Sequence, residues 1–240
     1  MRKPYRLFPE LLGQNGYRTL CSGKWGNGGQ ILNRCFQEVR NIFFRWAPEG
    51  MNQSHFLMAQ YDPTGQYPAS REKIVDRFTS EVFTDAAVEF IENYRGRDPF
   101  FVYTAYLSPH DPRTPPKRFA DLYDPKHIPL PPNYEPEHRF YNGHKRIRDE
   151  MLAPIPRTPD RLREEIAAYY GMISEVDFQI GCILTALEKT GQAENTIVVF
   201  AGDNGLAVGS TACWASRIYT ITVSGCHWYS KALVFPQISA

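Results

Sequence analysis

The sequence predicts an α/β fold in which helices cover both faces of a mostly parallel sheet. Two apolar runs, residues 100–107 (FFVYTAYL) and 196–201 (TIVVFA), have the continuous hydrophobic character of strands buried on both faces. A helical pattern precedes each run, and alternation of helices with buried strands is typical of parallel sheets. The chain has 240 residues, 42% of them hydrophobic, which is enough for one sizeable core.

The amino-terminal elements are predicted to be short. Phe8, Leu11 and Leu12 share one face of a helix expected over residues 5–14, and Asn15-Gly16 ends it. Residues 17–20, which follow, are partly β-prone.

The next stretch combines loops with a second helix. Residues 26–68 contain scattered Gly, Asn and Pro, which predicts long loops. A helix is expected over residues 72–94, because apolar side chains recur there at near-helical spacing. They are Ile74, Phe78, Val82, Ala86 and Phe90.

The second half holds a long loop and a long helix. Residues 109–159 are rich in proline and charge, which predicts little regular structure and a role in a site or a surface. Thr158 and Pro159 are suited to start a helix that Gly191 ends. Its apolar stripe recurs every seventh residue, at Ile166, Ile173, Ile180 and Leu187.

Composition excludes several function classes. The net charge is +1 and no basic stripe is present, which argues against a nucleic-acid partner. No apolar run reaches the length of a membrane span, and the first residues lead into no signal-peptide core. As written, the chain is expected to stay in the compartment where it is made. The five cysteines have no metal-site or disulfide spacing and are interpreted as small buried side chains.

Three polar clusters follow predicted strands, where ligands bind in parallel sheets. Asp203 and Asn204, on a glycine-flanked turn, could face one hard cation such as Ca²⁺, although the local sequence alone favours an ordinary turn. His110, between prolines, is either a rigidly presented acid, base or anion donor or a surface histidine, with equal weight. Lys24 beside Trp25 suits an anionic group, although a solvated lysine is the simpler interpretation.

In their order and spacing, these segments resemble the sulfatase family of the alkaline-phosphatase-like superfamily, over most of the chain. Residues 15–25 (NGYRTLCSGKW) resemble the family's GY-x-T…GKWH stretch, and residues 98–112 (DPFFVYTAYLSPHDP) its strand with the following histidine. Residues 169–184 resemble its long helix, and residues 195–205 (NTIVVFAGDNG) its last metal-binding strand. The set of four is a specific signal.

The resemblance implies hydrolysis of sulfate esters of small molecules or carbohydrates. In the family, a cysteine or serine of a C/S-x-P-x-R motif becomes formylglycine, whose hydrate attacks sulfur, while Ca²⁺ polarises the sulfate oxygens. Carried over by position, Lys24 would contact the sulfate and His110 would bind the sulfate or the leaving group. Asp203 and Asn204 would be calcium ligands. Family members are commonly exported to the periplasm, the extracellular space or the lysosome, but this sequence indicates no location.

Departures from the family pattern lead us to expect an inactive, amino-terminally truncated piece of the domain over residues 1–210. No C/S-x-P-x-R motif and no paired amino-terminal aspartates are present, and Met1 resembles an internal start. Neither Cys21 nor Cys35 is followed by the residues of the nucleophile motif. Gly26 stands where the family has histidine.

Residues 211–240 match nothing in the family and are expected to be an out-of-frame tail. One cytosine inserted after the Ser210 codon, with permitted codons, would encode SHGLLGKQ and then NLYDHSVRVPLVFQGPGIP, both family-like strings. The family's second sulfate-binding lysine would lie across the Ala215 and Ser216 codons.

Three other hypotheses stay open. A phosphatase or phosphodiesterase relative would share the scaffold, but such relatives bind two metals and the tail has no matching histidine cluster. A non-catalytic module that holds a sulfated glycan is favoured by Gly26. A decayed gene whose product folds poorly is the third.

Overall fold

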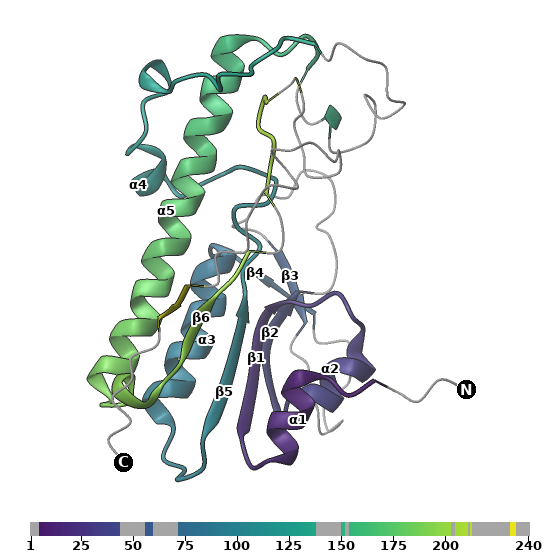
Figure 1. Ribbon diagram of the computed structural model, residues 1–240, viewed down its shortest axis with the longest axis vertical. Helices are drawn as coiled ribbons and strands as arrows, with labels where there is room; N and C mark the ends of the chain where they lie inside the picture. Colours follow the sequence, from purple (N-terminus) through teal and green to yellow (C-terminus); the bar gives the residue numbers. More distant parts are fainter. Residues whose placement is uncertain are drawn as a thin grey trace. The chain divides into compact units, whose positions relative to one another are not determined.

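A computed structural model of the chain describes residues 5–43, 56–59, 72–137, 150–151, 154–202, 205–210, 212 and 231–233. The chain forms two compact units, residues 1–116 with 172–193, and residues 117–171 with 194–240. The described elements, labelled in Figure 1, follow in chain order: α1 Phe8–Gln14, β1 Arg18–Lys24, α2 Gly29–Cys35, β2 Glu38–Phe43, β3 Phe56–Ala59, β4 Glu72–Val75, α3 Thr79–Asn93, β5 Phe100–Ala105, α4 Lys117–Ala120, η1 Pro125–His127, α5 Pro159–Lys189, η3 Ala193–Asn195, β6 Val198–Phe200 and β7 Lys231–Leu233.

A five-stranded sheet organises the first unit, in the order β4-β3-β2-β1-β5. The pairs β2–β1 and β1–β5 are parallel, and β3 and β4 extend the sheet in antiparallel fashion. Helices cover both faces: Phe36, just after α2, stacks on Phe101 of β5, whereas Phe90 of α3 packs edge-on against Phe100 of the same strand. Neighbouring residues of a strand point to opposite faces, so α2 and α3 lie on opposite sides. The predicted α/β class is confirmed, and the parallel pairs lie on the β5 side of the described sheet.

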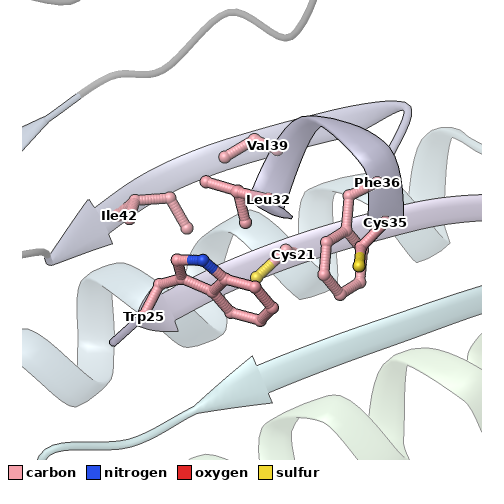
Figure 2. Close-up of a cluster of buried hydrophobic side chains, with 7 residues drawn as sticks. All are labelled: Cys21, Trp25, Leu32, Cys35, Phe36, Val39 and Ile42. Carbon is pink, nitrogen blue, oxygen red and sulfur yellow. The ribbon is translucent and has the colours of Figure 1, made fainter. Parts of the chain in front are cut away.

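The face that carries α2 holds a compact apolar cluster, which Figure 2 shows. Its seven buried residues are Cys21, Trp25, Leu32, Cys35, Phe36, Val39 and Ile42. Burying each large side chain of this kind stabilises the fold by about 1.5–3 kcal/mol. Cys21 and Cys35 are free thiols in this cluster, as the interpretation of buried small side chains requires. Cys182 is only half-buried, and Cys213 and Cys226 lie outside the described residues.

The prediction of long loops over residues 26–68 is wrong for its described part. This part contains α2, β2 and β3. Their formation depends on tertiary contacts: β2 pairs with β1, which lies earlier in the chain, and α2 packs Leu32 into the apolar cluster. Short elements of this kind give only weak periodic signals in the sequence.

The second predicted helix begins later than expected. Residues 72–75 form β4, which pairs with β3 from Phe56↔Val75 to Ala59↔Glu72, and α3 starts only at Thr79. The predicted face of α3 is otherwise correct, because Phe78, Val82, Ala86 and Phe90 are all buried. Pairing with a strand distant in sequence therefore overrides helical spacing at Ile74.

The long helix α5 has the predicted ends but not the predicted stripe. The Thr158 hydroxyl accepts a hydrogen bond from the Arg161 amide at 3.4 Å, and Gly191 adopts a φ of +69° after the last turn. Ile166 and Leu187 are buried, whereas Ile173 is 42% exposed. An α-helix has 3.6 residues per turn, so positions seven apart rotate by about 20° per repeat and leave a fixed face. In the second half of α5 the buried side is another one: Glu175 and Gln179 are buried and, at 3.6 residues per turn, lie roughly opposite Ile173.

The second unit has an apolar core of its own, formed by Ile128, Leu162, Ile166, Ala167 and Val208. The described part of residues 109–159 contains only the short α4, η1 and a 3₁₀ turn at residues 150–151, in agreement with the prediction of little regular structure. A buried ion pair ties this segment together, with Arg157 Nη2 3.1 Å from Glu150 Oε2 and both side chains 3% exposed. None of the described helices combines the length and apolar character needed to cross a membrane.

The predicted buried strand over residues 196–201 is a strand but is not buried. β6 pairs with β7 in an antiparallel two-stranded sheet, and Ile197, Val199 and Phe200 are 73%, 65% and 54% exposed. A strand becomes buried on both faces only when layers cover it, and the two-stranded ribbon in the described residues has no such cover. The other apolar run forms β5, but the prediction of burial on both faces is wrong there too: its residues are half-buried, with Tyr103 42% exposed, because β5 is the last strand of the described sheet.

Candidate functional site

Two of the predicted site residues lie at or beyond the carboxyl ends of neighbouring strands. Lys24 is the last residue of β1, and His110 follows five residues after β5 ends at Ala105. β1 and β5 are parallel neighbours in Figure 1, and Gly23 is the register partner of Ala105. Both strands therefore end at the same, carboxyl edge, which is where ligands bind in sheets of this type.

Gly23 allows β1 and β5 to approach closely at that edge. Its φ is +108°, and an added Cβ would lie 2.1 Å from the Ala105 carbonyl oxygen. Only glycine combines this backbone conformation with such a close contact. The glycine before Lys24 is thus a geometric requirement of the strand pair.

A β-bulge in β2 lies beside Lys24. Ser22 pairs with Arg40 and Gly23 with Ile42, so Asn41 is the extra residue, with a φ of +49°. Asparagine tolerates this conformation, and its Nδ2 donates to the Val82 carbonyl at 3.1 Å. Bulges bend a strand and redirect the side chains next to them, and here the bulge sits where Lys24 leaves the sheet.

The aromatic neighbour of Lys24 is not available to a ligand. Trp25 is 9% exposed and points into the apolar cluster (Figure 2), where its Nε1–H donates to the Gly28 carbonyl at 3.0 Å. Lys24 itself is half-buried. An anion at this edge would therefore meet the Lys24 ammonium without the indole.

The loop that carries His110 is held by hydrogen bonds and a buried ion pair. The His110 amide donates to the Leu107 carbonyl at 2.9 Å, and its Nδ1 lies 3.1 Å from the Asp111 carbonyl oxygen. Arg113 Nη2 lies 3.1 Å from Asp111 Oδ1, with the two side chains 2% and 13% exposed. The sequence pattern does not single out Asp111 or Arg113 as site residues, because charged residues in a proline-rich loop are ordinarily exposed.

Hydroxyl groups anchor the chain just before His110 to α3. The hydroxyls of Thr84 and Tyr106 share a hydrogen bond of 2.8 Å, and the Ser80 hydroxyl donates to that of Ser108 at 3.4 Å. Burial raises the pKa of Tyr106 to about 12, so its hydroxyl stays protonated at neutral pH. These contacts fix the start of the loop that presents His110.

Cys21 is poorly suited to nucleophilic chemistry. Burial raises the pKa of its thiol to about 12, and the thiolate rather than the thiol is the nucleophile. This agrees with the interpretation of the sequence, in which the residues that follow Cys21 rule it out as the nucleophile.

The predicted metal ligands, Asp203 and Asn204, lie outside the described residues. Within the described ranges, no group of three or more His, Cys, Asp or Glu side chains could hold a metal ion. Ca²⁺ takes six to eight oxygen ligands, and this pair supplies few of them. The calcium site therefore stays a prediction.

The family model described as Sulfatase matches residues 2–227 of the chain. An iduronate 2-sulfatase from Homo sapiens is 31% identical over 231 residues, which cover 88% of this chain and 42% of that protein. An arylsulfatase from Clostridium perfringens is 32% identical over 128 residues, or 51% of this chain and 25% of that protein. The chain thus spans less than half the length of these relatives.

Solved structures show the same fold. BT4656, solved in complex with its substrate D-glucosamine-2-N,6-O-disulfate, has a TM-score of 0.59 at 20% identity and matches 91% of this chain and 53% of that one. A phosphonate monoester hydrolase from Silicibacter pomeroyi has a TM-score of 0.56 at 21% identity, with 89% and 50% covered.

Proposed function

This chain belongs to the sulfatase family, and from that premise we propose that its Lys24 and His110 bind the sulfate group of a sulfated small molecule or carbohydrate. The proposal is supported by the parallel pairing of β1 and β5, because Lys24 is the last residue of β1 and His110 lies five residues past the end of β5. Lys24 offers a compact positive charge, and His110 offers a ring nitrogen that can donate to a sulfate oxygen or to the leaving alcohol.

The proposed reaction of the whole family domain is hydrolysis of a sulfate ester. The 240 residues contain no C/S-x-P-x-R motif, so no residue here can become the formylglycine nucleophile by that route. We therefore expect this chain to bind the sulfate ester without hydrolysing it.

Calcium is the cofactor we propose, with Asp203 and Asn204 as ligands. When bound, it would offset negative charge on the sulfate oxygens. Calcium affinity follows the number and charge of the ligands, so two side chains should bind it weakly.

A second candidate is a non-catalytic module that retains a sulfated glycan. Gly26 favours it, because the family's histidine at this position is replaced by a residue with no side chain. An added Cβ at Gly26 would meet no atom within 4 Å, so the lost donor leaves open space.

Binding can be measured by calorimetric titration with D-glucosamine-2-N,6-O-disulfate. Lys24→Met and His110→Gln should each weaken binding about tenfold or more, because each removes a charge-assisted hydrogen bond. Lys126→Met and His127→Gln are matched controls, since both residues are exposed and belong to the second unit. Equal losses in the controls, or unchanged binding in Lys24→Met, would contradict the proposal.

Turnover of a fluorogenic sulfate ester separates the remaining hypotheses. The chain should release no fluorophore with or without Ca²⁺. Release from the sulfate ester would disprove the expected inactivity, and release from a phosphate or phosphonate ester alone would identify a phosphoesterase relative.

A further inference from the structure

The outer side of β5 carries backbone groups that no described residue pairs with. β5 is the last strand of its sheet and has one neighbour there, β1 (Figure 1). The Pro99 carbonyl, just before β5, accepts a hydrogen bond from the Arg18 amide of β1 at 2.8 Å, so position 99 faces β1. Backbone groups alternate in direction along a strand, so Phe100, Val102 and Thr104 turn theirs away from β1. Within the described part of the chain, none of these outward N–H and C=O groups has a hydrogen-bond partner.

β5 also lacks the features that usually protect the edge of a sheet. An unpaired edge can bind a strand of another chain, and proteins ordinarily prevent this with charged side chains, proline or a β-bulge. The sequence of β5, FFVYTA, contains neither a charge nor a proline. Its register with β1 runs from Arg18↔Phe100 to Gly23↔Ala105 without a shift, so it has no bulge. The outer side of β5 is therefore suited to pairing with a further strand.

A second copy of β5 is complementary to this edge when it runs antiparallel and the register centres on Val102. In antiparallel pairs, directly opposite residues exchange both hydrogen bonds at every second position. Val102 would then pair with Val102 of the second copy, and Phe100 with Thr104 of the second copy. In this register the outward backbone groups of both strands are all satisfied.

The side chains are compatible with the same register. Phe101 and Tyr103 lie on the α2 face of the sheet, where both stack on Phe36, and Tyr103 is 42% exposed. Each would lie opposite the other across the pair, and aromatic pairs on neighbouring strands are favourable. Just before the strand, Asp98 would face Tyr106 of the second copy, so like charges do not meet there.

We propose that β5 is a dimerisation strand, through which two copies of the chain join their sheets edge to edge about a two-fold axis. The pairing is closed, because each copy contributes its β5 edge to the same contact. One strand from each copy makes a small interface, so the dimer should dissociate on dilution. The inference depends on the backbone of β5 and is independent of sulfate binding by Lys24 and His110.

Sedimentation velocity over a range of concentrations measures the assembly state of the full chain. The mass should rise from the 27.6 kDa of the monomer to twice this value as the concentration increases. Val102→Pro removes the central outward N–H and should weaken dimerisation by about tenfold or more. Val102→Thr is the matched control, because it keeps both the N–H and the branched side chain, and it should dimerise like the wild type.

Hydrogen exchange of the wild-type amides locates the interface without any substitution, which matters if circular dichroism shows that Val102→Pro does not fold. The three outward amides, those of Phe100, Val102 and Thr104, should exchange about tenfold more slowly in the dimer than in the dilute monomer. The amides of Phe101 and Tyr103 face β1 and should be protected to the same degree at both concentrations.

A chain that stays monomeric at every concentration, or a folded Val102→Pro variant that dimerises like the wild type, would overturn the inference. Outward amides that exchange slowly in the monomer would also overturn it, because another segment of the same chain would then occupy the edge. Assemblies larger than a dimer would reject the closed two-fold pairing. A β5 dimer that binds no sulfated sugar would uphold the pairing and reject the proposed function.

Discussion

Gly23 shows how one residue sets the geometry of the proposed binding edge. Its backbone lies in the left-handed region and its Cα faces the Ala105 carbonyl, so any side chain at position 23 would push β1 away from β5. The two strands that carry Lys24 and His110 depend on this contact for their spacing.

We therefore expect Gly23→Ala to lower the free energy of unfolding by about 3 kcal/mol or more, through backbone strain and the clash with β5. Gly16→Ala is the control, because Gly16 has a similar positive φ of +86° but open space around an added Cβ. Gly16→Ala should lower the free energy of unfolding by only about 1–2 kcal/mol, because it introduces backbone strain without a clash. Urea denaturation measures both, and equal losses would show that the close approach of the strands is unimportant.

At the scale of elements, strand identity and strand burial are separate properties. Residues 196–201 and 100–107 have similar apolar composition, yet β5 packs within a covered sheet while β6 pairs only with β7 among the described strands. The difference lies in the neighbours of each strand.

The exposure of β6 predicts tolerance to polar substitution. Val199→Thr should change the free energy of unfolding by less than about 0.5 kcal/mol, because Val199 is 65% exposed. Val39→Thr in β2 is the matched comparison, at 8% exposure, and should cost about 1–3 kcal/mol for burial of a hydroxyl. Chemical denaturation of both variants measures these changes in the free energy of unfolding. A loss at Val199 as large as that at Val39 would mean that β6 is buried after all.

At the scale of the whole molecule, buried acidic groups couple stability to alkaline pH. Burial raises the pKa of Cys21 from 9.0 to about 12 and that of Tyr106 from 10.0 to about 12. The unfolded chain therefore releases these protons at a lower pH than the folded chain does. Their contribution to stability is complete below pH 9 and decreases as the pH rises from 9 toward 12.

Each group adds about 1.4 kcal/mol per pH unit to this loss within its window. Cys21→Ala should remove one such contribution between pH 9 and 12, and Tyr106→Phe one between pH 10 and 12. Denaturation curves recorded from pH 8 to 11 give the slope of the free energy of unfolding against pH for each variant. The free energy at pH 8, where neither group titrates, gives the cost of the substitution itself. Wild-type slopes in both variants would contradict the raised pKa values.

Several features could be predicted from the sequence because their signals are local. The start and end of α5 follow from Thr158 and Gly191, and the buried face of α3 follows from the spacing of Phe78, Val82, Ala86 and Phe90. Lys24 and His110 could be named because the sequence predicts a strand before each of them, and these two strands, β1 and β5, are parallel neighbours.

By itself, the sequence determined the α/β class and the family, because motifs, caps and periodicity act over a few residues, and its choice of Lys24 and His110 for sulfate binding stays a prediction. The tertiary structure alone decided that residues 72–75 form a strand, that β6 is exposed and that Arg113 is buried with Asp111 beside His110. Each of these depends on partners or covering layers that local patterns do not specify. Strand pairing joins residues far apart in the chain, and the burial of a charge depends on the layers packed around it.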